Sequence, residues 1–373
     1  MKMRKLLALI LALSMAATVA ACGSASSAAK PAATEAAEEA AEPAEEGGEE
    51  AAAPAAASGD YTIRVALENS ETYPATLGLQ QMKKYVESHT DGHVKIDIYA
   101  NGQLGGEEDT LDQVAQGTLE MAVASFAPVV SFDNEFELLD IPFVFGTYEE
   151  AWMVLDSYVG TQIMDSLESA GMKGLAFMEN GFRQATSSKG AIETMADLSG
   201  LKIRTMQNNN HMEAFSAMGA NPTPVPFSEL YMALQQKVAD AQENPIANVT
   251  DKKLYEVQQY LSLTNQIYDA MPLVCNLDFF NSLPAEYQSV VQAGAIYGME
   301  YSRFCNHERE DLILEYLEGQ GMKINEVTPE AREEMKAAAQ PAVIKLVGGD
   351  IGQEKVDEYL ANVEAILGEI ANY

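Results

Sequence analysis

The chain has 373 residues, and its 56 Asp and Glu against 23 Lys and Arg give a formal net charge of −33 at pH 7. At roughly 100–200 residues per domain, this length predicts about two domains with accessory segments. The negative charge excludes nucleic-acid binding, which depends on phosphate neutralisation, and docking on anionic lipid headgroups. Three Cys and four scattered His exclude a disulfide scaffold and a Cys-rich zinc module. We expect neither a metal nor a cofactor.

The N-terminus is typical of a secretory leader. Three basic residues among the first five precede an apolar stretch at positions 6–17, which is too short to span a bilayer. Small residues come directly before Cys22, which resembles the lipobox of bacterial lipoproteins. We expect residues 1–21 to be a lipoprotein signal peptide. Cys22 would then carry the lipid that anchors an extracytoplasmic protein to the cell membrane. An ordinary secretory signal with an incidental Cys is the alternative.

Residues 22–59 are dominated by Ala, Glu, Pro, Ser and Gly. Such a composition cannot bury enough apolar surface to offset the entropy lost on ordering. We expect a flexible acidic spacer that holds the folded body away from the membrane surface. The signal and the spacer leave the folded body with a net charge of about −29. A site for an anion must therefore attract it through nearby positive groups, because the net negative charge of the folded body repels it.

Regular structure is predicted from Tyr61 onward. A strand, a helix, a strand, a helix and a short strand are predicted in turn at residues 61–67, 74–88, 94–100, 107–116 and 121–125. This order is typical of a mostly parallel sheet that is covered by helices.

A second α/β set follows. Strand patterns occur at 175–178, 183–187, 201–205 and 273–279, helical patterns at 211–218 and 229–238, and an extended proline-rich segment at 221–227. Ser228 is expected to cap the second of these helices.

One long helical pattern runs from Pro284 to about Glu318. At 1.5 Å per residue, roughly 35 residues span about 50 Å, so we expect this helix to cross both lobes of the fold. The sequence therefore predicts an α/β protein of two lobes with a ligand cleft between them.

Four motifs between residues 179 and 260 decide the predicted function. They are Asn180-Gly181-Phe182-Arg183-Gln184, Gly200-Leu201-Lys202-Ile203-Arg204, Pro226-Phe227-Ser228-Glu229 and Gln242-Glu243-Asn244-Pro245. Together they closely resemble the DctP-type solute-binding proteins of TRAP (tripartite ATP-independent periplasmic) transporters. The resemblance covers essentially all of residues 61 to about 340.

The resemblance implies a periplasmic-binding-protein-like fold with a carboxylate ligand between the lobes. It implies that Arg204 anchors the ligand carboxylate, that Arg183 is a second arginine of the site, that Asn244 contacts the ligand and that Phe227 is a pocket wall. It also implies integral membrane subunits of a TRAP transporter as partners. No enzymatic activity is expected, because the sequence contains no GxSxG, P-loop, kinase or Rossmann motif.

The residue chemistry agrees, although each side chain has a structural alternative. A guanidinium offers a flat fork of donors that matches a carboxylate at two points. Arg204 could instead be a solvated arginine at a strand end, and Arg183 could form an interdomain salt bridge. Asn244 could cap a turn, and Phe227 could belong to the core.

The N-terminal lobe is expected to supply the other ligand contacts, from strand ends and the turns after them. These residues are Glu68 and Asn69 after the first strand, Gln103 and Glu107 around the Gly105-Gly106 turn, and Ser125 after the third strand. Glu107 would repel a carboxylate ligand unless it accepts a hydrogen bond from a ligand hydroxyl or faces away.

Some positions depart from the family pattern. Sialic-acid-binding members carry an acidic residue where this chain has Ser125 and an arginine near Pro128, so sialic acid is not expected. Ala241 replaces the usual Gly and Gln266 replaces a common His. These departures limit what the resemblance says about the ligand.

We expect an extracytoplasmic receptor that captures a carboxylate by cleft closure and delivers it to a TRAP membrane transporter. A C4-dicarboxylate is the first choice of ligand, and a uronate or another sugar acid is the alternative. The negative body favours a monoanion, because its field does not steer a dianion inward. A surface-anchored hydrolase or an adhesin is the alternative from another class.

The predicted lobes are discontinuous in sequence. Residues 60–180 with 270–309 are expected to form the N-terminal lobe, and residues 181–269 with 310–373 the C-terminal lobe. Cys275 and Cys305 both lie in the folded body. They could form a disulfide or remain two buried thiols.

Overall fold

The structure is a computed structural model that describes residues 59–370. The predicted signal peptide, the lipid site at Cys22 and nearly all of the spacer lie outside these residues. None of the helices within 59–370 is both long and apolar enough to cross a membrane.

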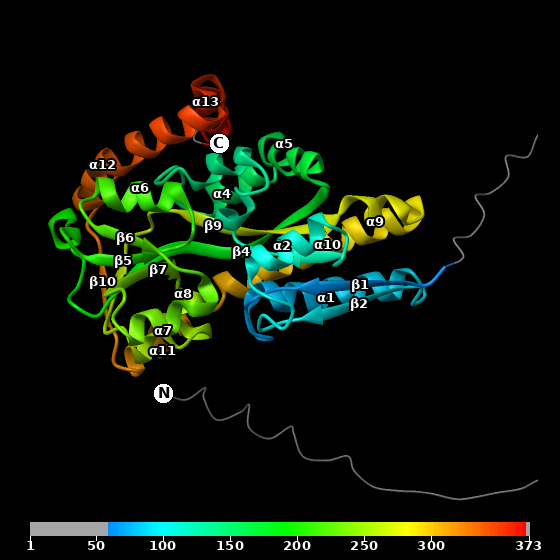
Figure 1. Ribbon diagram of the computed structural model, residues 1–373, viewed down its shortest axis with the longest axis horizontal. Coiled ribbons are helices and arrows are strands. Elements are labelled where there is room, and N and C mark those ends of the chain that lie inside the picture. Colours follow the sequence, from blue (N-terminus) through cyan, green and yellow to red (C-terminus); the bar gives the residue numbers. More distant parts are fainter. Residues whose placement is uncertain (1–58, 371–373) are drawn as a thin grey trace, which may run out of the picture. The chain divides into compact units, whose positions relative to one another are not determined.

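The described residues form one mixed sheet whose main path has the strand order β2-β1-β3-β9-β4-β7-β5-β6, with β8 and β10 attached beside β4 (Figure 1). The strands are β1 (Tyr61–Ala66), β2 (Val94–Tyr99), β3 (Met121–Val123), β4 (Met172–Ser187), β5 (Lys202–Thr205), β6 (Asn221–Pro224), β7 (Ala241–Pro245), β8 (Tyr260–Leu263), β9 (Tyr268–Asn276) and β10 (Lys323–Glu326).

Helices cover this sheet. They are α1 (Pro74–His89), α2 (Glu107–Ala115), α3 (Phe126–Val129), α4 (Tyr148–Leu155), α5 (Tyr158–Ser166), α6 (Asn209–Ala217), α7 (Leu230–Gln235), α8 (Ile246–Asp251), α9 (Leu277–Ser282), α10 (Ala285–His307), α11 (Glu310–Gly319), α12 (Pro329–Val347) and α13 (Gln353–Ile370). The predicted α/β class is confirmed. The N-terminal lobe denotes residues 60–180 with 270–309, and the C-terminal lobe residues 181–269 with 310–370, as predicted.

The first β–α–β–α–β unit forms as its pattern predicts. β1 pairs in parallel with β2 from Tyr61 opposite Val94 to Ala66 opposite Tyr99, and with β3 on its other side. The apolar face of α1 is buried against this unit, with Met82 fully inaccessible. Polar groups at the carboxyl ends of β1 and β3 therefore lie on one side of the N-terminal lobe.

β4 corrects the prediction of two separate strands. It is a single strand of 16 residues that absorbs the Asn180-Gly181 interruption as an irregularity in its pairing with β9. Gly181 has φ +113°, and a Cβ there would lie 3.1 Å from Nδ2 of Asn306 and from the Tyr148 hydroxyl. The first half of β4 pairs with β9 in the N-terminal lobe, and its second half pairs with β7 and β8. β4 thus continues from one lobe into the other.

Two other boundaries differ from the prediction. β9 ends at Asn276 because the Asn276 side chain caps α9 by accepting from Phe279 N, which places the predicted strand end inside a helix. Ser228 caps nothing, because it lies within a 3-10 turn at Phe227–Glu229 that comes before α7.

The predicted long helix is two consecutive helices, α10 and α11, which are interrupted at Glu308 and Arg309. α10 packs on α1 and β4, whereas α11 packs on α8. The helical segment therefore passes from one lobe to the other as expected, with a break between the two parts.

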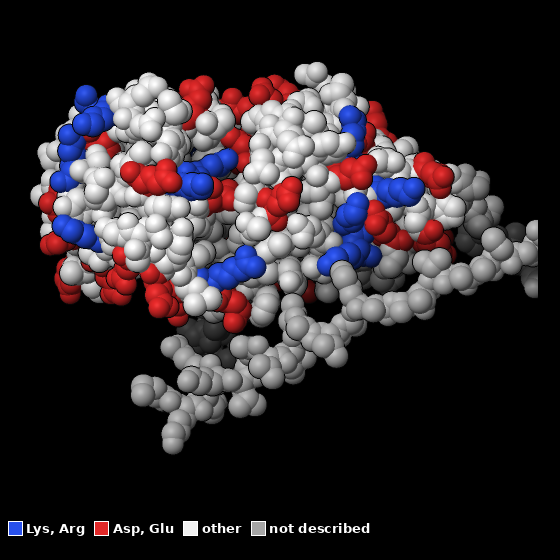
Figure 2. All heavy atoms as spheres, turned by 90° about the horizontal axis from the view of Figure 1, so that it is seen from below, with Lys and Arg blue, Asp and Glu red and all other residues white. Residues whose placement is uncertain are grey.

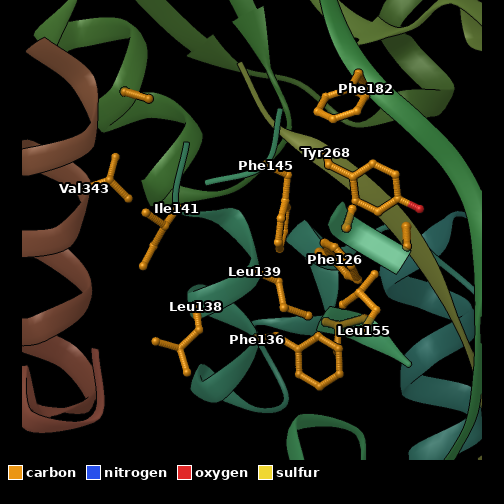
Figure 3. Close-up of a cluster of buried hydrophobic side chains, with 14 of the residues drawn as sticks. Phe126, Phe136, Leu138, Leu139, Ile141, Phe145, Leu155, Phe182, Tyr268 and Val343 are labelled. Atoms are coloured by element: carbon orange, nitrogen blue, oxygen red, sulfur yellow. The ribbon is translucent and has the colours of Figure 1, made fainter. Parts of the chain in front are cut away.

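A large apolar cluster contains side chains from both predicted lobes (Figure 3). Phe126 and Phe136 come from the N-terminal lobe, Phe182 and Tyr268 come from the crossing strands β4 and β9, and Val343 comes from α12. This cluster fixes the crossing strands against both lobes, so that the polar ends of β1, β3 and β5 keep defined positions.

Candidate ligand-binding site

A cavity of about 230 Å³ lies between the predicted lobes. Glu68, Gly106, Glu107, Glu108, Asp109 and Pro128 line it from the N-terminal lobe, and Arg204, Met206, Gln207, Pro226, Phe227, Ser228 and Glu229 from the C-terminal lobe. Four of the predicted site residues thus meet at one cavity. It is smaller than the roughly 300–1,000 Å³ of typical ligand pockets, which suits a small ligand.

Arg204 is the cation of this cavity. It lies on β5, and its side chain is fully buried. Its Nε and Nη2 donate to the Val225 carbonyl at 2.8 Å and 2.5 Å, while Nη1 has no partner within residues 59–370. Burial lowers the pKa of Arg204 to about 10, so the guanidinium is charged at neutral pH. A buried charged donor without a partner is costly, and an anion would satisfy it.

The proline-rich segment after β6 places the Val225 carbonyl that accepts hydrogen bonds from Arg204. Val225 N donates to the Thr205 carbonyl, and this pairing continues the parallel β5–β6 ladder. The Val225 carbonyl then faces the arginine on the neighbouring strand. Next in the chain, the half-buried Phe227 forms a wall of the cavity. The Nζ of Lys252 lies 4.6 Å from the centre of its ring.

Two carboxylates line the N-terminal side. Glu68 follows β1, and its Oε1 is buried without a partner in the described chain. Glu107 begins α2, and its Oε1 accepts from Ser125 N at 2.8 Å and from Ser125 Oγ at 3.0 Å. Burial raises the pKa of Glu68. Burial and the charge of Glu68 raise the pKa of Glu107 to about 7. Ser125 therefore acts behind Glu107 and does not itself line the cavity.

Arg183 is placed differently from Arg204. It is fully buried and donates through Nε and Nη2 to Glu243 and through Nη1 to Asp269, the last at 2.6 Å. Burial opposes charge on Glu243, but Arg183 and His211 outweigh it and lower the pKa of Glu243 to about 2. Arg183 is not among the residues that line the cavity. In this conformation it forms an ion pair within the predicted C-terminal lobe, and not the interdomain salt bridge that was the structural alternative. Its contact with ligand stays a prediction.

Two predicted asparagines lie in a buried chain of amides. Asn69 Nδ2 donates to Asn248 Oδ1 at 2.8 Å, and Asn248 Nδ2 lies 3.2 Å from Oδ1 of both Asn244 and Asn180. This chain joins the end of β1 to β7 and β4, across the predicted lobes. Neither Asn69 nor Asn244 lines the cavity, and Gln103 is exposed outside it. Their ligand contacts also stay predictions.

Sequence reasoning missed His211. It is buried on α6, with Nε2 3.1 Å from Asp140 Oδ1 and Nδ1 3.6 Å from Glu243 Oε1. Burial opposes protonation, but the two carboxylates raise the pKa of His211 to about 9. Asp140 also accepts from Asn208 Nδ2 at 2.8 Å. No local pattern marks this site, because the partners of His211 lie far from it in sequence.

The two cysteines in the described residues, Cys275 and Cys305, are free and buried. Burial raises the pKa of the Cys275 thiol far above its usual value. Of the two possibilities left open by the sequence, the structure has the buried thiols.

Acidic and basic side chains are both spread over the face shown in Figure 2. The cavity differs from such a surface, because its arginine and two of its carboxylates are at least nine-tenths buried. Buried charges interact more strongly than exposed ones because water screens them less. The cavity is therefore suited to hold a small molecule that carries a carboxylate.

The chain is similar to known proteins over most of its length. Residues 65–348 match the family described as bacterial extracellular solute-binding protein, family 7. The 2,3-diketo-L-gulonate-binding periplasmic protein YiaO of Escherichia coli is 33% identical over 263 residues, which are 70% of this chain and 80% of that protein. The C4-dicarboxylate-binding periplasmic protein DctP of Rhodobacter capsulatus is 30% identical over 301 residues, 79% of this chain and 88% of that protein.

Among solved structures, the sugar acid binding protein DctPAm of Advenella mimigardefordensis in complex with galactonate is similar, with a TM-score of 0.79 and 31% identity. The match covers 83% of this chain and 99% of that one. This similarity confirms the predicted fold of two α/β lobes.

Proposed function

Because this chain belongs to family 7 of the bacterial extracellular solute-binding proteins, we propose that it captures a small carboxylate at Arg204 and delivers it to the membrane subunits of a TRAP transporter. Members of the family are extracytoplasmic receptors for small organic acids that work with TRAP membrane components, and its relatives are receptors and not enzymes. A hydrolase or an adhesin is therefore no longer needed to explain the chain.

One observation carries the proposal. Arg204 is fully buried at a cavity between the predicted lobes, and its Nη1 is left without a partner by residues 59–370. Its Nε and Nη2 donate to the Val225 carbonyl, and these two hydrogen bonds hold the guanidinium in its orientation. A carboxylate that enters the cavity gains a charge-assisted hydrogen bond to a donor that is already oriented.

The position of the cavity between the predicted lobes supports closure on the ligand. A ligand that touches both walls stabilises the arrangement in which the walls are close, by as much as its affinity differs between the open and closed forms. Arg183 and Asn244 would support this step from beneath, because both belong to the buried network that joins the predicted lobes. We further propose that a lipid on Cys22 anchors the receptor to the extracytoplasmic side of the membrane.

Two ligand classes fit a site built on one arginine. Relatives are named for a C4-dicarboxylate and for 2,3-diketo-L-gulonate, and a similar structure holds galactonate. A dicarboxylate and a sugar acid are therefore both candidate ligands.

A thermal-shift screen of organic acids tests the receptor role. A ligand at 100-fold over its Kd adds about 2.7 kcal/mol to the free energy of unfolding of the native protein. We expect carboxylates to raise the melting temperature of the wild type and of Lys202→Ala, whose exposed side chain lies on the same strand. Arg204→Ala should lose the shift. A shift that survives in Arg204→Ala, or that is caused only by neutral sugars, would contradict the proposal.

A further inference from the structure

The cavity holds open hydrogen-bonding positions of opposite charge. Nη1 of Arg204 and Oε1 of Glu68 are both without partners in the described part of the chain. Arg204 is 0% exposed, Glu68 5% and Glu107 9%. Their placement is therefore set by the protein interior and not by solvent.

Within residues 59–370 these charged groups form no direct ion pair with one another. The guanidinium of Arg204 is fixed by Val225, and no salt bridge joins it to a carboxylate of residues 59–370. Glu107 is fixed on the other wall by the backbone and hydroxyl of Ser125. The Glu68 carbonyl accepts from Lys252 Nζ at 3.0 Å, which holds that residue at the end of β1. The arginine and the two carboxylates thus stay apart with the cavity between them.

We propose that Glu68 and Glu107 form a charge filter, so that the site accepts an acid with one carboxylate and hydroxyl groups and rejects a second carboxylate. The proposal rests on the receptor function proposed above and names its substrate class. The ligand carboxylate accepts from Arg204, and ligand hydroxyls donate to Glu68 Oε1 and to the Glu107 carboxylate. Glu68 and Glu107 are thereby specificity-determining residues.

The surroundings of the pair strengthen the filter. Glu108, Asp109 and Glu229 line the same cavity, so a second ligand carboxylate would meet further negative charge. The positive charges of Lys252 and Arg204 partly offset the negative charge of Glu68. The buried Asp269 instead adds negative charge near Glu107. A hydroxyl makes the same hydrogen bonds to the pair without this repulsion.

The filter should weaken in acid. Burial and the charge of Glu68 raise the pKa of Glu107 to about 7. Protonation of the pair removes the repulsion that a second carboxylate meets. The affinity for a dicarboxylate should therefore rise as the pH falls through 7, by up to about tenfold per pH unit for each proton taken up. The affinity for a hydroxylated monocarboxylate should rise much less over the same pH range.

The test is calorimetric titration of the full chain with two acids of the same carbon number. Erythronate has one carboxylate and hydroxyls on its other carbons, whereas succinate has two carboxylates and no hydroxyl. At about pH 8, where both succinate carboxyls are ionised, we expect succinate to bind at least about tenfold more weakly than the best acid in a panel of C4 to C6 aldonates. The difference in affinity between succinate and the aldonate should become smaller at about pH 6.

Substitutions identify the residues responsible. Glu68→Gln and Glu107→Gln keep the side-chain shape but remove the charge, so each should strengthen succinate binding and weaken aldonate binding, with the ratio changing roughly tenfold. Glu315→Gln removes the same charge from an exposed position on α11 and should leave the ratio unchanged. If a variant does not fold, the titrations of the wild type at the two pH values still test the proposal.

The outcomes separate the filter from the receptor function. Succinate binding as tight as that of every aldonate at about pH 8, with the ratio unchanged in both Gln variants, overturns the filter. The receptor role then still stands if Arg204→Ala loses succinate. Tighter binding of a zwitterionic amino acid than of any aldonate overturns the hydroxyl assignment. Failure of every acid to bind the wild type overturns the receptor function itself.

Discussion

His211 is a buried cation between two acidic side chains. Its ring lies 3.1 Å from Asp140 and 3.6 Å from Glu243, and Glu243 in turn binds Arg183. Buried charges are tolerated when they are paired, and breaking one such pair leaves an uncompensated charge. His211 thus connects the segment before Ile141 to β7, beneath the candidate site.

This pairing makes stability depend on pH. The pKa of His211 is raised from 6.5 to about 9 on folding, so its contribution is fully present below pH 6.5 and is lost as the pH rises through 9. The linked loss is up to about 3 kcal/mol. Urea unfolding across this range should show the loss in the wild type and not in His211→Gln. His89→Gln, at an exposed histidine, should behave as the wild type. Parallel pH profiles for wild type and His211→Gln would exclude the charged pairing.

Among single residues, the sequence could predict four that line the cavity. Glu68 follows β1 and Glu107 begins α2, and both line the cavity from the predicted N-terminal lobe. Arg204 lies near the carboxyl end of β5 and Phe227 begins the turn before α7, and both line it from the predicted C-terminal lobe. His211 could not be predicted, because its role depends on two carboxylates that only the folded chain brings near.

Helices α1 and α10 approach each other unusually closely. A Cβ on Gly78 would lie 2.4 Å from the Gly298 carbonyl oxygen and 2.6 Å from Cε of Met178. Neither backbone can move without disturbing the sheet beneath, because α10 also packs on β4. The two glycines therefore set the distance between the helices.

Gly78→Ala should lower the free energy of unfolding by about 1–3 kcal/mol, because the added methyl group overpacks this contact. Gly319→Ala is the matched control. Gly319 ends α11 with nothing near its Cβ position, so alanine there should be neutral or stabilising by up to about 1 kcal/mol. Urea denaturation of both variants measures the difference. A Gly78→Ala protein as stable as the wild type would show that the helices can separate freely.

Element boundaries were harder to predict than element types. The sequence predicts separate strands at 175–178 and 183–187, but the positive φ that Gly181 adopts keeps β4 continuous through a bulge. The helical pattern between Pro284 and Glu318 contains no Pro or Gly near Glu308. Nothing local therefore indicated that α10 ends there.

The distance between the two walls of the cavity should shorten when the protein binds an acid ligand. α2 and α7 follow opposite walls of the cavity, and both Asp112 on α2 and Gln235 on α7 are exposed. Spin labels at Asp112→Cys and Gln235→Cys should report a larger population at the shorter distance when an acid ligand is added. The same labels in Arg204→Ala should not respond. Identical distributions with and without a bound ligand would contradict closure.

The order of the strands also bears on how the chain is made. β3 and the first half of β4 both pair with β9, which is not complete until residue 276. While the chain emerges from a ribosome or a membrane pore, these earlier strands therefore present unpaired edges for as long as the intervening residues take to appear. Unpaired edges invite association with other chains. Export of this receptor should consequently depend on holding its N-terminal lobe unfolded or shielded until the returning strand arrives.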